Sequence, residues 1–209
     1  RRIYDNLLKS ILFMLSTNLG EIVVLFVAVM CGMVTPLLPI QILWINLVTD
    51  SFPALALSVD PADKDIMHRQ PTDSSKGFLN KHFLTKVGLQ GLLIGALTLT
   101  AYFIGVKTSV DVAHTMTFAT LAFSQMTMIF SIRAGQKIAF NGMFSNKYLW
   151  GAIVLVVLLM ALVLFVPALQ TVFHVVSLDG TQWIWVTALS FAALIINDLF
   201  KLITNRIKA

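Results

Sequence analysis

The sequence is poor in charge. Only 12% of its 209 residues are Asp, Glu, Lys or Arg, whereas 57% are hydrophobic. Its mean hydropathy is +0.84. Soluble domains carry about 25% charged residues, so this composition excludes a soluble globular protein. A lipid bilayer must be the main solvent of the chain.

Cysteine is also scarce, and so are the patterns typical of nucleic-acid binding. The single cysteine, Cys31, cannot form a disulfide within the chain and indicates no redox compartment. The formal net charge is +5, but no basic stripe is interleaved with aromatic residues. We therefore expect the chain to contact a lipid bilayer and no nucleic acid.

Six apolar runs are long enough to cross the hydrocarbon core, which takes about 20 residues of helix. They predict helices at about 7–32, 38–58, 84–105, 114–133, 148–168 and 183–204. Pro36 and Pro39 follow the first run closely, so the first two helices should form a tight antiparallel hairpin. Gly88, Gly91 and Gly95 in the third run should allow close approach of another helix. The predicted fold is an all-α polytopic membrane helix bundle with six transmembrane helices.

Positive charge is distributed unequally between the two sides of this predicted bundle. If successive loops alternate between sides, all but one of the 15 Lys and Arg residues fall on one side, the exception being Lys107. The positive-inside rule then places both termini, and the polar loop at 59–83, in the cytoplasm. Because the loops are short, we expect a bacterial plasma membrane. The chain opens on Arg1 without a methionine, so we expect it to be part of a longer protein.

Two acidic residues, Glu21 and Asp50, lie well inside the first and second predicted helices. Carboxylates are costly in a bilayer and normally mark an ion or proton path. Helical spacing places Asn18 on the face of Glu21, and it places Asn46 and Thr49 on the face of Asp50. The antiparallel hairpin should bring the two polar faces together near the middle of the membrane.

These side chains offer carboxylate, amide and hydroxyl oxygens, the hard ligands that calcium takes in sets of about 6 to 8. No histidine or cysteine accompanies them, which argues against zinc and copper. Gln125 in the fourth span is one more candidate oxygen, although a hydrogen bond to another helix explains it equally well. Pro53 removes a backbone donor and can free carbonyl oxygens toward an ion. The alternative for the whole set is hydrogen bonding that only holds the bundle together.

Three segments are notable together. They read Ser-Thr-Asn-Leu-Gly-Glu at 16–21, Pro-Ile-Gln-Ile-Leu-Trp-Ile-Asn-Leu-Val-Thr-Asp at 39–50, and Asp-Lys-Asp-Ile-Met-His-Arg-Gln-Pro at 63–71. These segments resemble the C-terminal membrane half of P-type cation pumps, above all the calcium pumps of the sarco/endoplasmic reticulum type. The resemblance covers essentially the whole chain. It implies the last six of ten transmembrane helices and membership of a calcium-transporting ATPase, a translocase.

The resemblance also implies roles for individual residues. By position, the calcium ligands would be Asn18, Glu21, Asn46, Thr49 and Asp50, with Asp50 bridging two ion sites where both exist.

Two positions depart from the pumps that bind two ions. Gln125 falls where those pumps have a glutamate, which puts the second ion in question. Ser51 replaces a glycine, which implies less unwinding of the helix there. Three acidic residues fall in the cytoplasmic loop that contacts the phosphorylation domain in the family: Asp60, Asp63 and Asp65.

The motifs that hydrolyse ATP are missing from this sequence. It has no Asp-Lys-Thr-Gly-Thr phosphorylation motif, no nucleotide or actuator domain, and no Pro-Glu-Gly-Leu-Pro helix break. The resemblance therefore implies that ATP and Mg²⁺ bind in other domains of a parent chain. Its N-terminal membrane helices and cytoplasmic domains would be the partners of this part. Since two adjacent carboxylates repel each other once Ca²⁺ leaves, we predict proton counter-transport through Glu21 and Asp50.

Three alternatives remain open at this point. A P-type pump for sodium or manganese would use the same oxygen ligands. The chain could also be an ATP-independent secondary cation transporter or channel. Inverted repeats would support that alternative, and we find none in the sequence. A structural membrane subunit would need partners for both buried carboxylates.

Overall fold

The computed structural model describes residues 1–62, 80–140 and 142–208, with side chains as far as Thr204. Every regular element in these ranges is a helix, which confirms the predicted all-α class. The elements are α1 (Arg2–Met30), α2 (Pro39–Trp44), the π-helix η1 (Ile45–Asp50), α3 (Ser51–Ser58), α4 (Lys81–Gly105), α5 (Val110–Arg133), α6 (Lys147–Phe165), α7 (Pro167–Phe173) and α8 (Gly180–Lys208).

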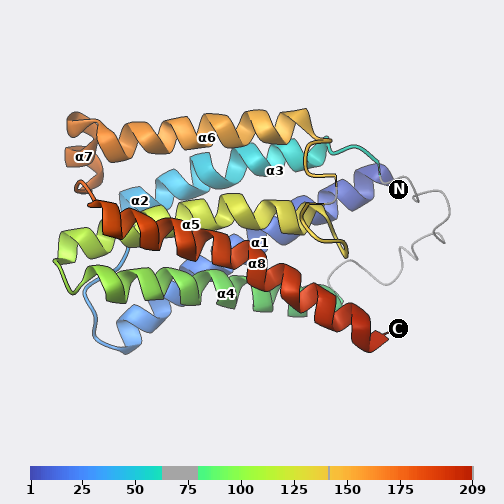
Figure 1. Cartoon of the computed structure of the whole chain (residues 1–209), viewed down its shortest axis with the longest axis horizontal. Helices are drawn as coiled ribbons and strands as arrows, with labels where there is room; N and C mark the ends of the chain where they lie inside the picture. The colour runs from blue at the N-terminus through green and yellow to red at the C-terminus, as the bar shows by residue number, and fades with distance from the viewer. Residues whose placement is uncertain (63–79, 141, 209) are drawn as a thin grey trace.

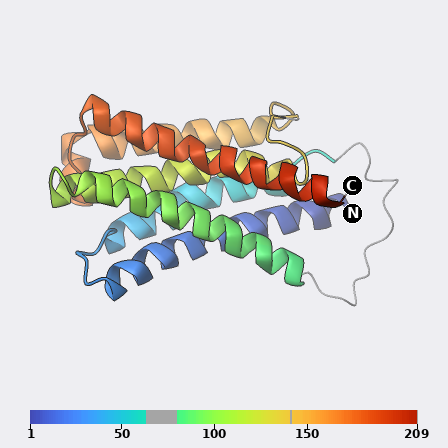
Figure 2. The ribbon, with the colours of Figure 1, turned by 60° about the horizontal axis from the view of Figure 1, so that its bottom comes forward.

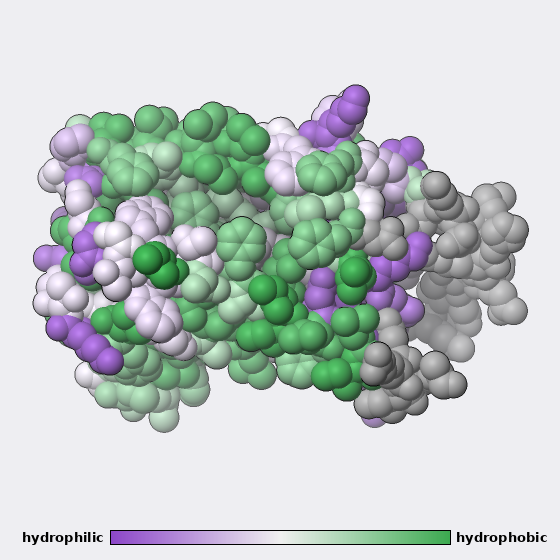
Figure 3. Space-filling view, viewed as in Figure 1, coloured by the Kyte–Doolittle hydropathy of each residue, from purple (hydrophilic) through white to green (hydrophobic). Residues whose placement is uncertain are grey.

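Six helical stretches are long and apolar enough to cross a membrane, as predicted, and one of them combines α2, η1 and α3. They run along the long axis of the molecule, with both chain termini at one end (Figures 1 and 2). We call this the terminal end, and the end that carries α7 the opposite end. The side of the bundle seen in Figure 3 is mostly apolar between its two ends, as expected for helices in lipid.

The central helix of the bundle is α5. In its most apolar stretch 89% of the residues are buried, against 33% to 50% in the other five spans. It packs against α4 and α8, while α3 contacts α1 and α6 (Figure 1). Met116, Leu121, Met128 and Ile129 of α5 are fully buried in the apolar core. Polar residues in the middle of α5, such as Thr120, Ser124 and Gln125, therefore lie inside the bundle rather than against lipid.

Side-chain caps and prolines determine where several helices begin and end. Asn80, Ser109 and Asn146 accept hydrogen bonds from backbone N–H groups in the first turns of α4, α5 and α6. The fifth predicted span runs to residue 168, whereas α6 ends at Phe165. The difference arises because Pro167 disfavours a helical conformation at the residue before it. Pro167 starts the short helix α7 instead.

Two glycines of α4 allow its backbone to approach α1 closely. A Cβ atom built on Gly91 would lie 2.8 Å from the side chain of Leu19, and one on Gly95 would lie 2.8 Å from Val23. These distances are too short for real Cβ contacts, so the small side chain is required. Gly88, the third glycine of the predicted set, faces open space instead. The contact fixes the rotation of α1 about its axis. It therefore also fixes the direction in which the face that carries Glu21 points.

Replacing Gly95 with valine in the full-length parent should destabilise the membrane region. The added side chain must displace Val23, and overpacking of this kind costs about 1–3 kcal/mol. Gly88→Val is the matched control, because no atom lies within 4 Å of the position of its Cβ. Thermal unfolding in detergent measures both variants. Equal unfolding temperatures for the two would contradict the close contact of α1 with α4.

Candidate cation site

Two carboxylates from different helices are buried well inside the bundle. Glu21 of α1 is 5% exposed, and Asp50, the last residue of η1, is 2% exposed. They lie near each other, because each carboxylate accepts a hydrogen bond from the helix that carries the other. A carboxylate in such a low-dielectric environment requires hydrogen bonds, a proton or a cation. The structure thus brings together the two acidic residues that the sequence singled out.

Each carboxylate has one oxygen held by a hydrogen bond and one without a partner. Asn46 Nδ2 donates to Glu21 Oε2 at 2.9 Å, and Thr17 Oγ1 donates to Asp50 Oδ2 at 2.7 Å. Glu21 Oε1 and Asp50 Oδ1 are buried and receive no hydrogen bond from the described part of the chain. The bonded oxygens fix the orientation of each group, and the other oxygens keep their capacity to bind a ligand.

Thr49 and Gln125 add further unpartnered polar atoms. Both side chains are fully buried, and Gln125 of α5 lies beside Glu21. Within the residues described, nine buried side-chain polar atoms lack a hydrogen bond, and five of them belong to Glu21, Thr49, Asp50 and Gln125. Buried polar atoms are normally paired. The unpartnered oxygens of Glu21, Asp50 and the neighbouring Gln125 are therefore available to a ligand.

The other two predicted ligands are only half-buried. Asn46 also donates to a backbone carbonyl one turn earlier, at 3.0 Å, and its amide oxygen remains an acceptor. Asn18 hydrogen-bonds to neither carboxylate. The residue that contacts Asp50 is Thr17, to which the sequence analysis gave no role. A signal was present, since Thr17 precedes Glu21 by four residues and therefore shares its helix face.

A π-helical segment carries the second half of the site. The sequence predicted one continuous helix here, whereas Ile45–Asp50 forms η1 between α2 and α3. Pro53 has no N–H group, so the backbone ladder loses a bond one turn before it. Ser51 Oγ donates to the carbonyl of Asn46 at 2.9 Å, which adds a side-chain hydrogen bond to the backbone of this segment. Such segments widen a helix and frequently occur at functional sites.

This set of donors suits a hard cation. Carboxylate, hydroxyl and amide oxygens are the ligands of Ca²⁺, Mg²⁺ and Mn²⁺. Residues 1–62, 80–140 and 142–208 contain no group of three or more His, Cys, Asp or Glu side chains that would hold a metal. Neutral oxygens, or groups outside these residues, would therefore have to complete the coordination of an ion at Glu21 and Asp50.

Asp60, predicted to lie in a loop that contacts another domain, is buried at the terminal end of the bundle. It is 2% exposed. Its carboxylate accepts hydrogen bonds from Arg133 Nε at 2.6 Å, Asn146 Nδ2 at 2.9 Å and Lys9 Nζ at 3.1 Å. These donors belong to α5, the start of α6 and α1. One carboxylate therefore ties three elements to the end of α3.

The backbone at this point is also held by α1. Arg2 Nε and Asn6 Nδ2 donate to the carbonyl of Asp60 at 3.0 Å and 2.8 Å. The chain is therefore anchored where it leaves α3. The other two acidic residues predicted for this loop, Asp63 and Asp65, lie outside the described residues.

Comparison with known proteins finds similarity along the whole chain. Residues 34–203 match the family described as cation transporting ATPase, C-terminus. The chain is 38% identical to Calcium-transporting ATPase 1 of Bacillus cereus, over 97% of this chain and 25% of that protein.

A second bacterial protein and a plant protein are also similar. The chain is 38% identical to the calcium-transporting ATPase of Bacillus subtilis, over 91% of this chain and 22% of that protein. It is 30% identical to Calcium-transporting ATPase 3, endoplasmic reticulum-type, of Arabidopsis thaliana, over 98% of this chain and 24% of that protein. The chain thus spans about a quarter of the length of these relatives.

Proposed function

Because the chain belongs to the cation-transporting ATPase family and corresponds to its C-terminal membrane region, we propose that it is the membrane part of an ATP-driven calcium exporter. One observation carries the proposal. Glu21 and Asp50 face one site, and each has one bonded and one unpartnered buried oxygen. The calcium-transporting ATPases to which the chain is similar support Ca²⁺ as the transported ion.

In this proposal Glu21 and Asp50 neutralise the ion and contribute an oxygen each. Thr17 is a positioning residue, because its hydroxyl group holds the second oxygen of Asp50. The neutral oxygens come from Asn18, Asn46, Thr49 and Gln125. Calcium takes about 6 to 8 oxygens, so the N-terminal membrane helices of the parent would supply the remainder. The neutral Gln125 favours one ion over two, because only two carboxylates are present to balance the charge.

Energy would come from parts of the parent chain outside this sequence. We propose that ATP and Mg²⁺ bind in its cytoplasmic domains, and that the acidic loop containing Asp60, Asp63 and Asp65 receives the signal from the phosphorylation domain. Both termini would then lie in the cytoplasm of a bacterium, with the bundle in the plasma membrane. The bacterial relatives support this location.

Proton counter-transport follows from the chemistry of the site. When Ca²⁺ leaves, two neighbouring carboxylates in a low-dielectric environment repel each other, so at least one of them should take a proton. Those protons would leave when the next Ca²⁺ binds. Each cycle would therefore move protons opposite to calcium.

The test is transport by the full-length parent in inverted membrane vesicles supplied with ATP. We expect calcium uptake, accompanied by proton movement out of the vesicles that stops when calcium is omitted. Sodium and manganese are the rival ions and are assayed in parallel, because the same oxygens bind them. Transport of either one in preference to calcium would reject the ion we propose, and uptake without ATP would indicate a secondary transporter. Calcium uptake with no opposing proton flux would reject the proposed proton counter-transport.

A further inference from the structure

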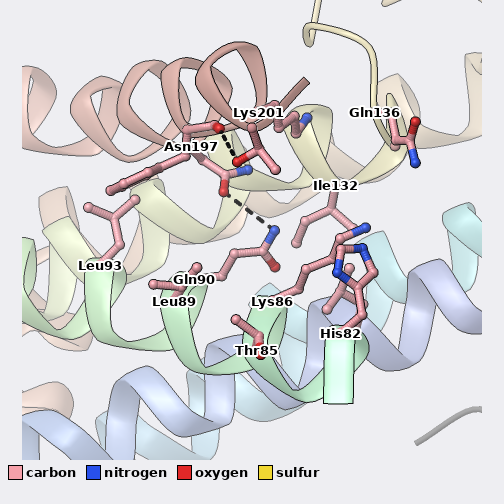
Figure 4. A pocket seen from close by; sticks show the side chains of 14 residues that line it. His82, Thr85, Lys86, Leu89, Gln90, Leu93, Ile132, Gln136, Asn197 and Lys201 are labelled. Atoms are coloured by element: carbon pink, nitrogen blue, oxygen red, sulfur yellow. Dashed lines mark hydrogen bonds between the residues drawn. The ribbon is translucent and has the colours of Figure 1, made fainter. Parts of the chain in front are cut away.

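A cavity of about 380 Å³ opens at the terminal end of the bundle, between α4 and α8. In Figure 4 the labelled side chains of α4 face those of α8 across it, and Ile132 of α5 lies between the two helices. The cavity is separate from the cation site, since none of its lining residues is a candidate ion ligand. Its lining combines a pair of amides, a basic mouth and apolar walls.

The two most buried polar side chains that line the cavity are amides, Gln90 and Asn197. Gln90 Nε2 of α4 donates to Asn197 Oδ1 of α8 at 3.5 Å (Figure 4). Behind them, Ser16 Oγ donates to Gln90 Oε1 at 3.1 Å, and Asn197 Nδ2 donates to Ser131 Oγ at 2.7 Å. Both amides are therefore held in place from the protein side and present a polar floor to the cavity.

The mouth of the cavity is basic. Lys86 and Lys201 line it from opposite helices, together with His82. Lys201 Nζ donates to Asp198 Oδ1 at 3.0 Å and to the backbone carbonyls of Ser131 and Lys137 at 2.6 Å and 3.1 Å, so its ammonium group is held at the mouth by the protein. No carboxylate is among the described residues that line the cavity. Two ammonium groups on opposite helices create a positive potential at the mouth, which favours an anion there.

The remaining walls are apolar and reach the lipid-facing surface. They are lined by Leu89 and Leu93 of α4 and by Phe200 of α8. Leu89 is 51% exposed and Phe200 is 49% exposed, so the described part of the chain leaves this side uncovered. Lys86 lies five residues after the start of α4, which is about 7.5 Å along the helix. The cavity therefore has a charged mouth near the membrane surface and apolar walls below it.

We propose that this cavity binds a membrane phospholipid with an anionic headgroup. The phosphate lies at Lys86, where the charge of Lys201 also attracts it. The glycerol and ester oxygens lie beside Gln90 and Asn197, and an acyl chain follows the apolar wall at Leu89. A free phosphate ion would match the mouth but not the apolar wall, and a neutral lipid would match the wall but not the mouth. Basic pockets between transmembrane helices are suited to acidic lipid headgroups.

The experiment measures lipid binding to the purified full-length parent by native mass spectrometry. In nonionic detergent, phosphatidylglycerol should bind more tightly than phosphatidylcholine with the same chains. Lys86→Gln should weaken phosphatidylglycerol about fivefold, which corresponds to about 1 kcal/mol per basic side chain at an anionic surface. Lys81→Gln is the matched control, because Lys81 lies on the same helix but does not line the cavity. Calcium-dependent phosphorylation reports that both variants are folded.

A second pair of variants adds either a negative or a positive charge at the cavity. Thr204 is exposed at the cavity and hydrogen-bonds only within α8. Thr204→Glu should weaken binding of phosphatidylglycerol, and Thr204→Lys should strengthen it. The proposal is overturned if both lipids bind equally, if Lys81→Gln acts like Lys86→Gln, or if the two Thr204 variants behave alike. Displacement of the lipid by millimolar inorganic phosphate would assign the site to a soluble anion instead.

Discussion

Replacing Asp50 with asparagine in the full-length parent is expected to abolish the calcium-dependent phosphorylation from ATP that the proposed function requires. Asparagine can still accept the hydrogen bond of Thr17 through its carbonyl oxygen. Its NH₂ group then takes the place of the unpartnered Oδ1, so a donor replaces the proposed ion ligand and one negative charge is lost. Losing a second-shell group costs 10- to 100-fold in metal affinity, so losing this ligand should cost more than about 100-fold.

Asp198→Asn is the matched control for this result. Asp198 is also a buried carboxylate, but both of its oxygens have partners within the protein. Ser131 Oγ and Lys201 Nζ donate to Oδ1, and the backbone N–H of Ala139 donates to Oδ2. We expect this variant to lose stability and to keep its calcium dependence. Calcium-dependent phosphorylation that survives in Asp50→Asn would reject the assignment of the cation site.

The fold was predictable because its main determinant is local in sequence. A helix in lipid satisfies its own backbone, so length and hydropathy alone identify the spans. The end of α6 was less predictable, since Pro167 had to be weighed against an apolar run that continues past it. The glycines of α4 predicted a close contact with another helix, but not which helix or which of the three glycines would make it. The register of the contact with α1, which uses Gly91 and Gly95 but not Gly88, depends on how the two helices are rotated.

The candidate site was predictable to the extent that it follows helical spacing. Glu21 and Asp50 were singled out because carboxylates are rare at membrane depth. The hydrogen bond from Thr17 to Asp50 joins two helices, so no spacing within one helix reveals it. The π-helix η1 was also hidden, because Pro53 indicates a disturbed helix but not which form the disturbance takes. The buried position of Asp60 depends on donors from other elements, and these are remote in sequence.

Replacing Asp60 with asparagine should cause the largest loss of stability among these variants. Arg133 is 9% exposed, and its Nε donates to the carboxylate of Asp60 at 2.6 Å. Asparagine would leave the guanidinium charge buried without a counter-charge, which costs about 3–5 kcal/mol for a buried pair. Lys9 can turn toward water, so it should contribute less. Thermal and denaturant unfolding of the full-length parent in detergent measure the loss.

Asp111→Asn is the control, since Asp111 is an exposed acid in the first turn of α5 and should leave stability near that of the wild type. The double variant Asp60→Asn with Arg133→Gln removes both charges. Its loss of stability should be smaller than the sum of the two single losses, because no unpaired charge remains buried. Together, the two single variants and the double variant form a double-mutant cycle. The cycle shows whether Asp60 and Arg133 stabilise the fold as an ion pair or whether Asp60 acts only in signalling. If Asp60→Asn abolished transport without lowering the unfolding temperature, the carboxylate would act in signalling, and the stabilising role inferred from its three side-chain donors would be wrong.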